Sequence, residues 1–179
     1  MKPGALVIFL ASIAGLWPGS SALAAQDWDA CAMLLKADVE AAFAPRVFSP
    51  GTPGHDKPKS SPKLADVSSC TYSSPGAFAK DRLSATLLAR RSPDDASGVT
   101  PQAAREGAIK LKGIPVDVAG LGEGAYWLNL GSSAFPVIQL NVFRGKREWF
   151  IFSISGRAID SNAALAGLTK MAKAVAAQK

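Results

Sequence analysis

The segment Val137-Ile-Gln-Leu-Asn-Val-Phe-Arg-Gly-Lys-Arg-Glu-Trp-Phe-Ile-Phe-Ser-Ile-Ser155 has the strongest strand pattern in the chain. Two runs rich in β-branched and aromatic residues, Val137 to Phe143 and Glu148 to Ser155, flank the turn Arg144-Gly145-Lys146. This arrangement predicts an antiparallel hairpin. Successive side chains of a strand point to opposite faces. The hairpin therefore has one face with Phe150, Phe152 and Ile154, and an opposite face with Trp149 and Ile151.

Upstream of this hairpin, four more segments favour strands. The run Arg82 to Arg90 alternates apolar and polar residues, and it pairs naturally with Ser68 to Ser73 across a turn at Ser74-Pro75-Gly76. Ile114 to Val118 and Ala125 to Leu130 are also expected to be extended, and the glycine cluster 120–124 separates them. These runs predict a sheet that is built largely from antiparallel neighbours.

Three segments with helical spacing surround these strands. Asp27 to Phe43 has an apolar stripe near the 3.6-residue period, and Asp38 would cap or restart a second turn. Thr100-Pro101 opens a helix that Gly113 stops, and Ser161 to Ala177 forms an amphipathic helix with Asp160 or Ser161 as its cap. The order of elements predicts an α+β fold, an antiparallel sheet with helices packed mainly on one face.

A different composition marks residues 44–63, where five prolines accompany several glycines, serines and lysines. Such a composition predicts a long, mobile loop. The loop would separate the N-terminal helix from the first strand of the sheet.

The first 24 residues are expected to form a signal peptide. Lys2 precedes an apolar run from Ala5 to Leu16, and Ala22-Leu23-Ala24 matches a small-x-small cleavage pattern. The run is shorter than the roughly 20 residues that span a bilayer as a helix. Cleavage after Ala24 would leave residues 25–179, a size that suits a single domain.

Export decides how the two cysteines, Cys31 and Cys70, are interpreted. In an oxidising compartment they are expected to form one structural disulfide. The alternative is a pair of free, buried thiols. The residues before Cys31, Asp27-Trp28-Asp29-Ala30, lack the small and aliphatic character that lipidation needs, so we expect no lipid anchor.

Net charge narrows the possible partners. The chain has 20 basic and 14 acidic residues, and loss of Lys2 with the leader would leave a net charge of +5. This excess would favour weak contact with anionic membrane surfaces, although it could also serve only for solubility. We expect no nucleic-acid partner, because the chain has a secretion signal and no recognition motif.

Motifs for catalysis are weak. Gly120-x-Gly122-x-x-Ala125 resembles a dinucleotide fingerprint, but a strand follows where that motif needs a helix, so a glycine-rich turn is the better interpretation. His55 is the only histidine, and it lies in the proline-rich segment without partners for a triad or a zinc site. Paired carboxylates remain the one catalytic alternative. We therefore expect no metal and no cofactor.

Two groups of residues are candidates for binding. The aromatic set Tyr126, Trp127 and Trp149 would line a ligand or partner surface if both tryptophans share the sheet face opposite Phe150 and Phe152; otherwise these residues belong to the core. The second group is the basic hairpin tip, whose alternative role is a solvated turn. It comprises Arg144, Lys146 and Arg147.

Three motifs together resemble a family of small exported bacterial proteins of unknown function, found among proteobacterial periplasmic proteins and actinobacterial secreted lipoproteins. They are Cys31-x-x-Leu34-Leu35-x-x-Asp38-Val39-Glu40, Ser69-Cys70-x-Tyr72, and Gly120-Leu121-Gly122-Glu123-x-Ala125-Tyr126-Trp127. The resemblance implies an α+β domain with a disulfide between the matched cysteines, and it supplies no catalytic residues. Unlike the lipoproteins, this chain lacks a lipid-accepting cysteine.

These observations favour an exported, non-catalytic binding or interaction domain in the periplasm or secreted outside the cell. Its ligand would be an envelope protein or a small molecule, and we expect a monomer. One alternative is a hydrolase that uses carboxylates alone. Another is an envelope-surface protein held on anionic lipid by its basic charge.

Overall fold

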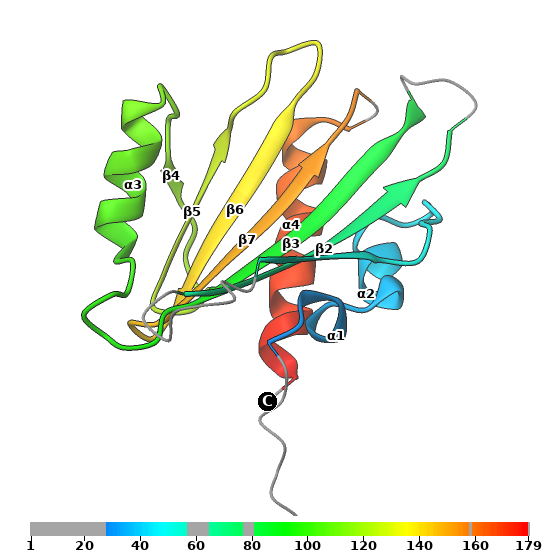
Figure 1. The fold of residues 1–179 in the computed structure, drawn as a ribbon. Coiled ribbons are helices and arrows are strands. Elements are labelled where there is room, and N and C mark those ends of the chain that lie inside the picture. The colour runs from blue at the N-terminus through cyan, green and yellow to red at the C-terminus, as the bar shows by residue number, and fades with distance from the viewer. Residues whose placement is uncertain (1–27, 57–64, 77–80, 158, 179) are drawn as a thin grey trace, which may run out of the picture.

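The computed structural model describes residues 28–56, 65–76, 81–157 and 159–178. In this part of the chain, seven strands form one antiparallel sheet with the order β1-β2-β3-β7-β6-β5-β4 (Figure 1). The strands are β1 Thr52–Asp56, β2 Asp66–Ser74, β3 Leu83–Arg91, β4 Val116–Asp117, β5 Gly124–Asn129, β6 Val137–Arg144 and β7 Glu148–Ser155. The helices are α1 Ala30–Met33, α2 Lys36–Ala42, α3 Pro101–Lys110 and α4 Ser161–Ala177. The α+β fold expected from the sequence is confirmed.

The predicted hairpin supplies two central strands, β6 and β7. Phe152 on β7 lies between Leu87 of β3 and Leu140 of β6, so these three side chains share one face. All three are buried, as are Phe150 and Ile154 on the same face of β7. Burial of apolar side chains along three adjacent strands is the main stabilising contribution at the centre of the sheet.

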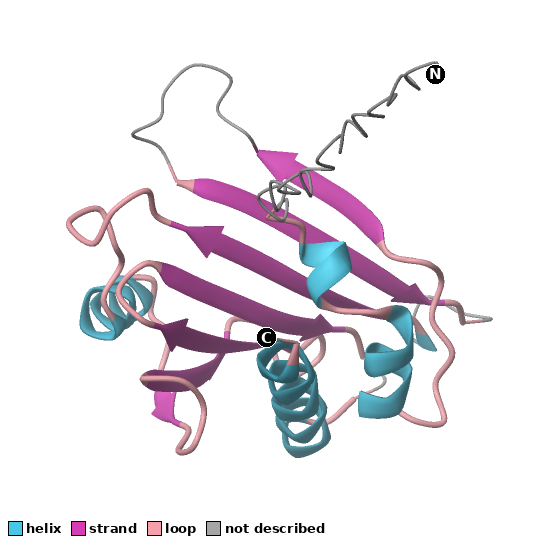
Figure 2. Cartoon of the chain, turned by 90° about the horizontal axis from the view of Figure 1, so that it is seen from below, coloured by secondary structure: helices cyan, strands magenta, loops and turns pink. Residues whose placement is uncertain are grey.

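Three helices cover this apolar face. Figure 2 shows α1, α2 and α4 together on one side of the sheet, and α3 lies apart from them. Helix α4 packs on β6, β7 and α2, and its buried side chains include Leu168, Met171 and Val175. The Asp160 carboxylate accepts hydrogen bonds from the backbone N–H groups of Asn162 and Ala163, so the expected N-cap is confirmed.

A smaller apolar cluster lies on the opposite face, beneath α3. Its buried members are Tyr126, Leu128 and Phe143, and Ala104 and Ala108 of α3 pack against them. Thr100 caps α3 through the N–H of Ala103, as the Thr100-Pro101 pattern predicts. The helices are thus unequally divided between the two faces.

The N-terminal helical segment forms two short helices, and the second starts at the place where the sequence predicts that Asp38 caps or restarts a turn. Helix α1 ends at Met33, its C-cap Leu34 has an extended backbone, and α2 starts at Lys36. The Asp38 carboxylate accepts a hydrogen bond from the N–H of Leu35, which satisfies a donor exposed by the break. The Cys31–Cys70 disulfide, with Cα atoms 5.0 Å apart, joins α1 to β2 and confirms the expected pairing.

The range 44–63 differs from its prediction as one continuous loop. Residues 52–56 form β1, which pairs with β2 at an edge of the sheet. Proline at position 53 is compatible with this place, because an edge strand need not donate from every N–H. Residues 57–63 lie outside the described residues, as do the predicted signal peptide and the cleavage site after Ala24.

The glycine cluster forms a turn, as expected. Gly120 and Gly122 have φ values of 77° and 58°, in the left-handed region that glycine adopts without a Cβ penalty. A Cβ on Gly122 would lie 2.2 Å from the carbonyl oxygen of Phe143. Strand β5 begins directly afterwards at Gly124, so the region lacks the helix of a dinucleotide site.

Among the described residues, no helix is long and apolar enough to cross a membrane.

Candidate functional site

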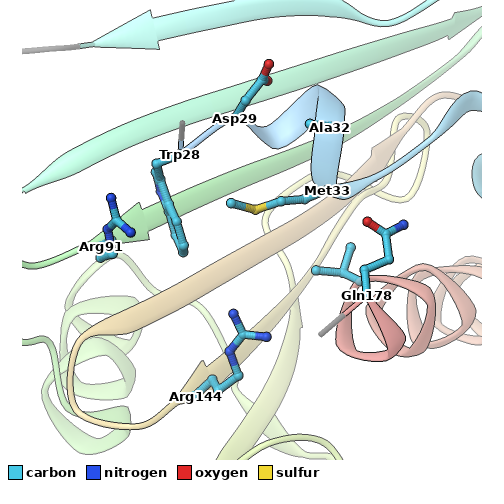
Figure 3. A pocket seen from close by; sticks show the side chains of 8 residues that line it. Trp28, Asp29, Ala32, Met33, Arg91, Arg144 and Gln178 are labelled. Atoms are coloured by element: carbon cyan, nitrogen blue, oxygen red, sulfur yellow. The ribbon is translucent and has the colours of Figure 1, made fainter. Parts of the chain in front are cut away.

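A small hollow of about 200 Å³ lies at one end of the sheet, where four segments meet. The chain entering α1, the ends of β3 and β6, and the last turn of α4 each contribute to it (Figure 3). Its lining residues are Trp28, Asp29, Ala32, Met33, Arg91, Arg144, Val175 and Gln178. We name it the Trp28 hollow.

Trp28 forms a fixed wall of this hollow. Its indole N–H donates a hydrogen bond to the carbonyl oxygen of Ala89 at 3.0 Å, and its ring centroid lies 5.8 Å from that of Phe150. Only 6% of its surface is exposed. The guanidinium carbon of Arg91 lies 4.7 Å from the Trp28 ring centroid, a cation–π distance. The wall is therefore rigid, apolar and bordered by positive charge.

Two arginines bring that charge to the hollow. Arg91 donates to Asp66 at 3.2 Å through Nη2, and Arg144 donates to Glu148 at 2.5 Å through Nε. Arg144 also lies over Phe150, with its guanidinium carbon 5.0 Å from the ring centroid. A guanidinium has five N–H donors, so one carboxylate contact occupies a minority of them. Both arginines retain donors for an incoming anion.

The basic hairpin tip lies next to the Trp28 hollow. Lys146 and Arg147 line a shallow groove of about 440 Å³, together with Arg91 and Arg144. Arg147 also donates through Nε to the carbonyl oxygen of Ser92 at 2.8 Å, which fastens the tip to the segment after β3. The structure thus brings the three tip residues of the sequence analysis together with Arg91, and Arg144 is the one that reaches the hollow.

The structure separates the aromatic candidates. Trp127 pairs with Leu140 and therefore faces the main core, whereas Trp149 pairs with Phe143 on the opposite face. Trp149 stacks on Phe143 at 5.6 Å between centroids and donates to the side-chain oxygen of Asn141 at 3.1 Å. Tyr126 is buried in the same small cluster. The two tryptophans do not share a face, and their role in binding stays a prediction.

Burial affects the chemistry of Tyr126. Desolvation raises the pKa of its hydroxyl, and the nearby positive charge of Arg105 acts in the opposite direction. The guanidinium carbon of Arg105 lies 5.0 Å from the tyrosine ring centroid. Tyr126 is thus kept as a neutral phenol that packs beneath α3.

The hydrolase alternative of the sequence analysis depends on a pair of carboxyl groups. That chemistry needs one carboxyl with a raised pKa to act as an acid. The carboxyl pKa shifts resolved in the described residues are downward. Hydrogen bonds lower the pKa of Glu40 through Lys36, of Asp94 through Ser97 and of Asp160 through Ala163. The described residues also contain no cluster of three or more His, Cys, Asp or Glu side chains that could hold a metal ion.

A wider groove of about 540 Å³ lies near the start of β3, and it offers less chemistry. Half of its ten lining residues are serines, with Arg82 as the charged residue and Phe135 as the aromatic one. It is also more open to solvent than the Trp28 hollow. The smaller hollow combines two arginines with apolar side chains, and its one carboxylate, Asp29, accepts a hydrogen bond from the N–H of Cys31. We therefore take it as the candidate site.

Sequence reasoning missed Trp28 and Arg91. The hydrogen bond from Trp28 to Ala89 spans 61 positions of sequence, so no local pattern indicates it. Arg91 is the last residue of β3 and follows another arginine, so the alternating pattern assigns it no special place. The one sequence feature that could have indicated Arg91 is its position directly after Arg90, where two consecutive arginines interrupt the alternation of apolar and polar residues in β3.

Comparison with known proteins relates the fold to an extracellular domain. No protein-family model and no curated protein sequence matches the chain. Among solved structures, the extracellular domain of PknH from Mycobacterium tuberculosis is similar, with a TM-score of 0.50 and 15% sequence identity. The match covers 83% of this chain and 95% of that domain. At this identity the likeness shows a shared fold, one that also occurs in an extracellular domain of a bacterial protein.

Proposed function

We propose that this protein is an exported, non-catalytic binding domain of the bacterial periplasm or envelope, and that the Trp28 hollow takes a small anionic ligand. Two observations support export: the fold is shared with a domain described as extracellular, and the chain contains a disulfide. The signal-peptide pattern of residues 1–24 points the same way.

The convergence of Arg91 and Arg144 on one hollow carries this proposal. Their free N–H groups would donate to a carboxylate or phosphate, which guanidinium groups bind in a planar, often bidentate way. Trp28, Met33 and Val175 would contact an apolar part of the ligand. The hollow is smaller than the roughly 300–1,000 Å³ of typical drug-sized sites. The ligand class is therefore a small anion with a short apolar group.

Replacement of Arg144 by glutamine tests this proposal. The exported protein would first be screened by thermal shift against small carboxylates and phosphates with short aliphatic or aromatic groups, and hits would be measured by calorimetry. We expect Arg144→Gln to weaken binding of a hit about tenfold or more, because a charge-assisted hydrogen bond contributes roughly 1.5–3 kcal/mol. A hit whose affinity is the same for both proteins would contradict the site.

Arg157→Gln is the matched control, since Arg157 is exposed and follows β7 at the other end of the sheet. It removes the same charge without touching the hollow. If both variants weaken binding equally, the effect comes from net charge, and the proposed site is wrong. A screen without any hit would count against a small anionic ligand.

A further inference from the structure

Exposed aliphatic side chains gather at the end of the sheet away from the Trp28 hollow. Leu111 is 78% exposed and Ile114 is 80% exposed, and both lie in the connection between α3 and β4. Exposed large apolar residues also flank this connection and occupy the neighbouring β5–β6 connection; they are Ile109, Val116, Leu130 and Phe135. Several exposed apolar residues at one end of a sheet mark an interaction surface more often than scattered single residues do.

Topology places the two connections together. Strands β4 and β5 are antiparallel with Val116 opposite Trp127, so the chain before β4 and the chain after β5 leave the sheet at the same end. Figure 1 shows both connections at the top of the molecule, the α3–β4 connection at the C-terminal end of α3 and the β5–β6 connection above β5 and β6, whereas the hairpin tip between β6 and β7 lies at the bottom. We name residues 109–116 and 130–135 the apolar end.

The α3–β4 connection is held in a defined conformation. The N–H of Gly113 donates to the carbonyl oxygen of Ala108 at 2.9 Å, and Lys112 adopts a left-handed φ of 64°. A Cβ on Gly113 would lie 2.7 Å from Leu128 Cδ1, so the turn packs directly on the sheet. An ion pair between Arg105 and Asp117 joins α3 to β4. The exposed leucine and isoleucine are therefore presented by a structured turn.

Charge identifies the kind of surface that fits the apolar end. Between positions 109 and 116 the ionisable side chains are Lys110 and Lys112, and positions 130–135 contain none. The acidic residues on either side are Asp117, which pairs with Arg105, and Glu106, which accepts a hydrogen bond from Gln102. Two copies of this surface facing each other would bring four lysines together, whereas an anionic bilayer offers both an apolar interior and negative headgroups.

We propose that the apolar end docks on anionic lipid surfaces, with Leu111 and Ile114 entering the bilayer interface and Lys110 and Lys112 contacting the headgroups. This interaction is independent of the Trp28 hollow, which lies at the other end of the sheet. A docked molecule would keep the hollow open to the solvent.

Vesicle co-sedimentation of the exported protein tests this proposal. The wild type should partition onto vesicles of mixed phosphatidylcholine and phosphatidylglycerol more strongly than onto phosphatidylcholine alone. Lys110→Gln with Lys112→Gln should lower the partition coefficient on the mixed vesicles about tenfold or more. Leu111→Ser with Ile114→Ser should lower it at least tenfold on the same vesicles, because the inserted apolar area is lost.

Val47→Ser is the matched control, because Val47 is 64% exposed and lies between α2 and β1. It should leave partitioning unchanged, and circular dichroism would verify the fold of each variant. Wild-type protein that stays in the supernatant with mixed vesicles would overturn the proposal. So would equal losses for Val47→Ser and the apolar-end variants. A third outcome would also overturn it: the wild type does not bind vesicles but forms a dimer, and the Leu111→Ser, Ile114→Ser variant is a monomer. The apolar end would then be the interface between two copies of this chain.

Discussion

Replacing both Cys31 and Cys70 with alanine is expected to lower the free energy of unfolding by about 4 kcal/mol. The bridge closes a loop between residues 39 positions apart. In the chain-entropy model, a loop of this length restricts the unfolded state by about 4 kcal/mol. Other contacts hold the same segment, including hydrogen bonds from Trp28 to Ala89 and from the Ala30 N–H to Ser68. We therefore expect a folded variant with a lower urea midpoint.

Urea unfolding of the exported wild type and the double variant would measure the difference, with the slope of the transition checked for change. Addition of a reductant supplies the control: it should destabilise the wild type and leave the double variant unaffected. A loss below about 1 kcal/mol would mean that the unfolded ensemble of this protein gains little freedom when the bridge is removed, contrary to the entropic model. If the reductant also lowered the free energy of unfolding of the double variant, its effect would not come from the Cys31–Cys70 disulfide.

The central sheet could be predicted from the sequence because its signals are local. The alternation of apolar and polar residues in 82–90 and 148–155 sets which side chains face the core, and the structure buries Leu83, Leu87, Phe150 and Phe152 accordingly. The starts of α3 and α4 were equally predictable, since Thr100 and Asp160 cap through bonds that span three residues or fewer. Period and capping both act within a few positions of sequence.

The pairing register between separate strands was not predictable in the same way. Whether Trp127 and Trp149 share a face depends on the register of β5 against β6 and β7, and a shift of one residue exchanges the faces. β1 was missed for a related reason: its residues are typical of loops, and pairing with β2 gives them extended structure. Long-range packing decides both features.

The candidate site could not be predicted from local sequence patterns, for the same reason. Trp28, Arg91 and Arg144 meet because α1, β3 and β6 converge at one end of the sheet. Of these three residues, only Arg144 is a binding candidate in the sequence analysis, where it belongs to the basic hairpin tip. The opposite end has the exposed aliphatic residues. The two proposed interactions therefore occupy opposite ends of one sheet, and a variant at one end should leave the other interaction intact.

Gly167→Ala in α4 is expected to destabilise the protein by about 2 kcal/mol, although alanine normally favours a helix. Gly167 is buried where α4 crosses α2, and an added Cβ would lie 2.1 Å from Cε1 of Phe43. Phe43 is itself buried and packs against Phe48, with ring centroids 6.1 Å apart, so its ring has little space to move. Thermal and urea unfolding would measure the loss. In a Phe43→Ala background the same substitution should cost much less, because the clashing ring is gone.

Gly107→Ala in α3 separates this packing effect from helix propensity. Gly107 is also a helical glycine, but a Cβ there would have no neighbour within 4 Å. It should therefore raise the free energy of unfolding by about 0.5–1 kcal/mol, the usual gain of alanine over glycine in a helix. Opposite signs at positions 107 and 167 would show that close contact between α4 and Phe43 requires glycine. Stabilisation at both positions would mean that α2 and α4 lie farther apart than the structure places them.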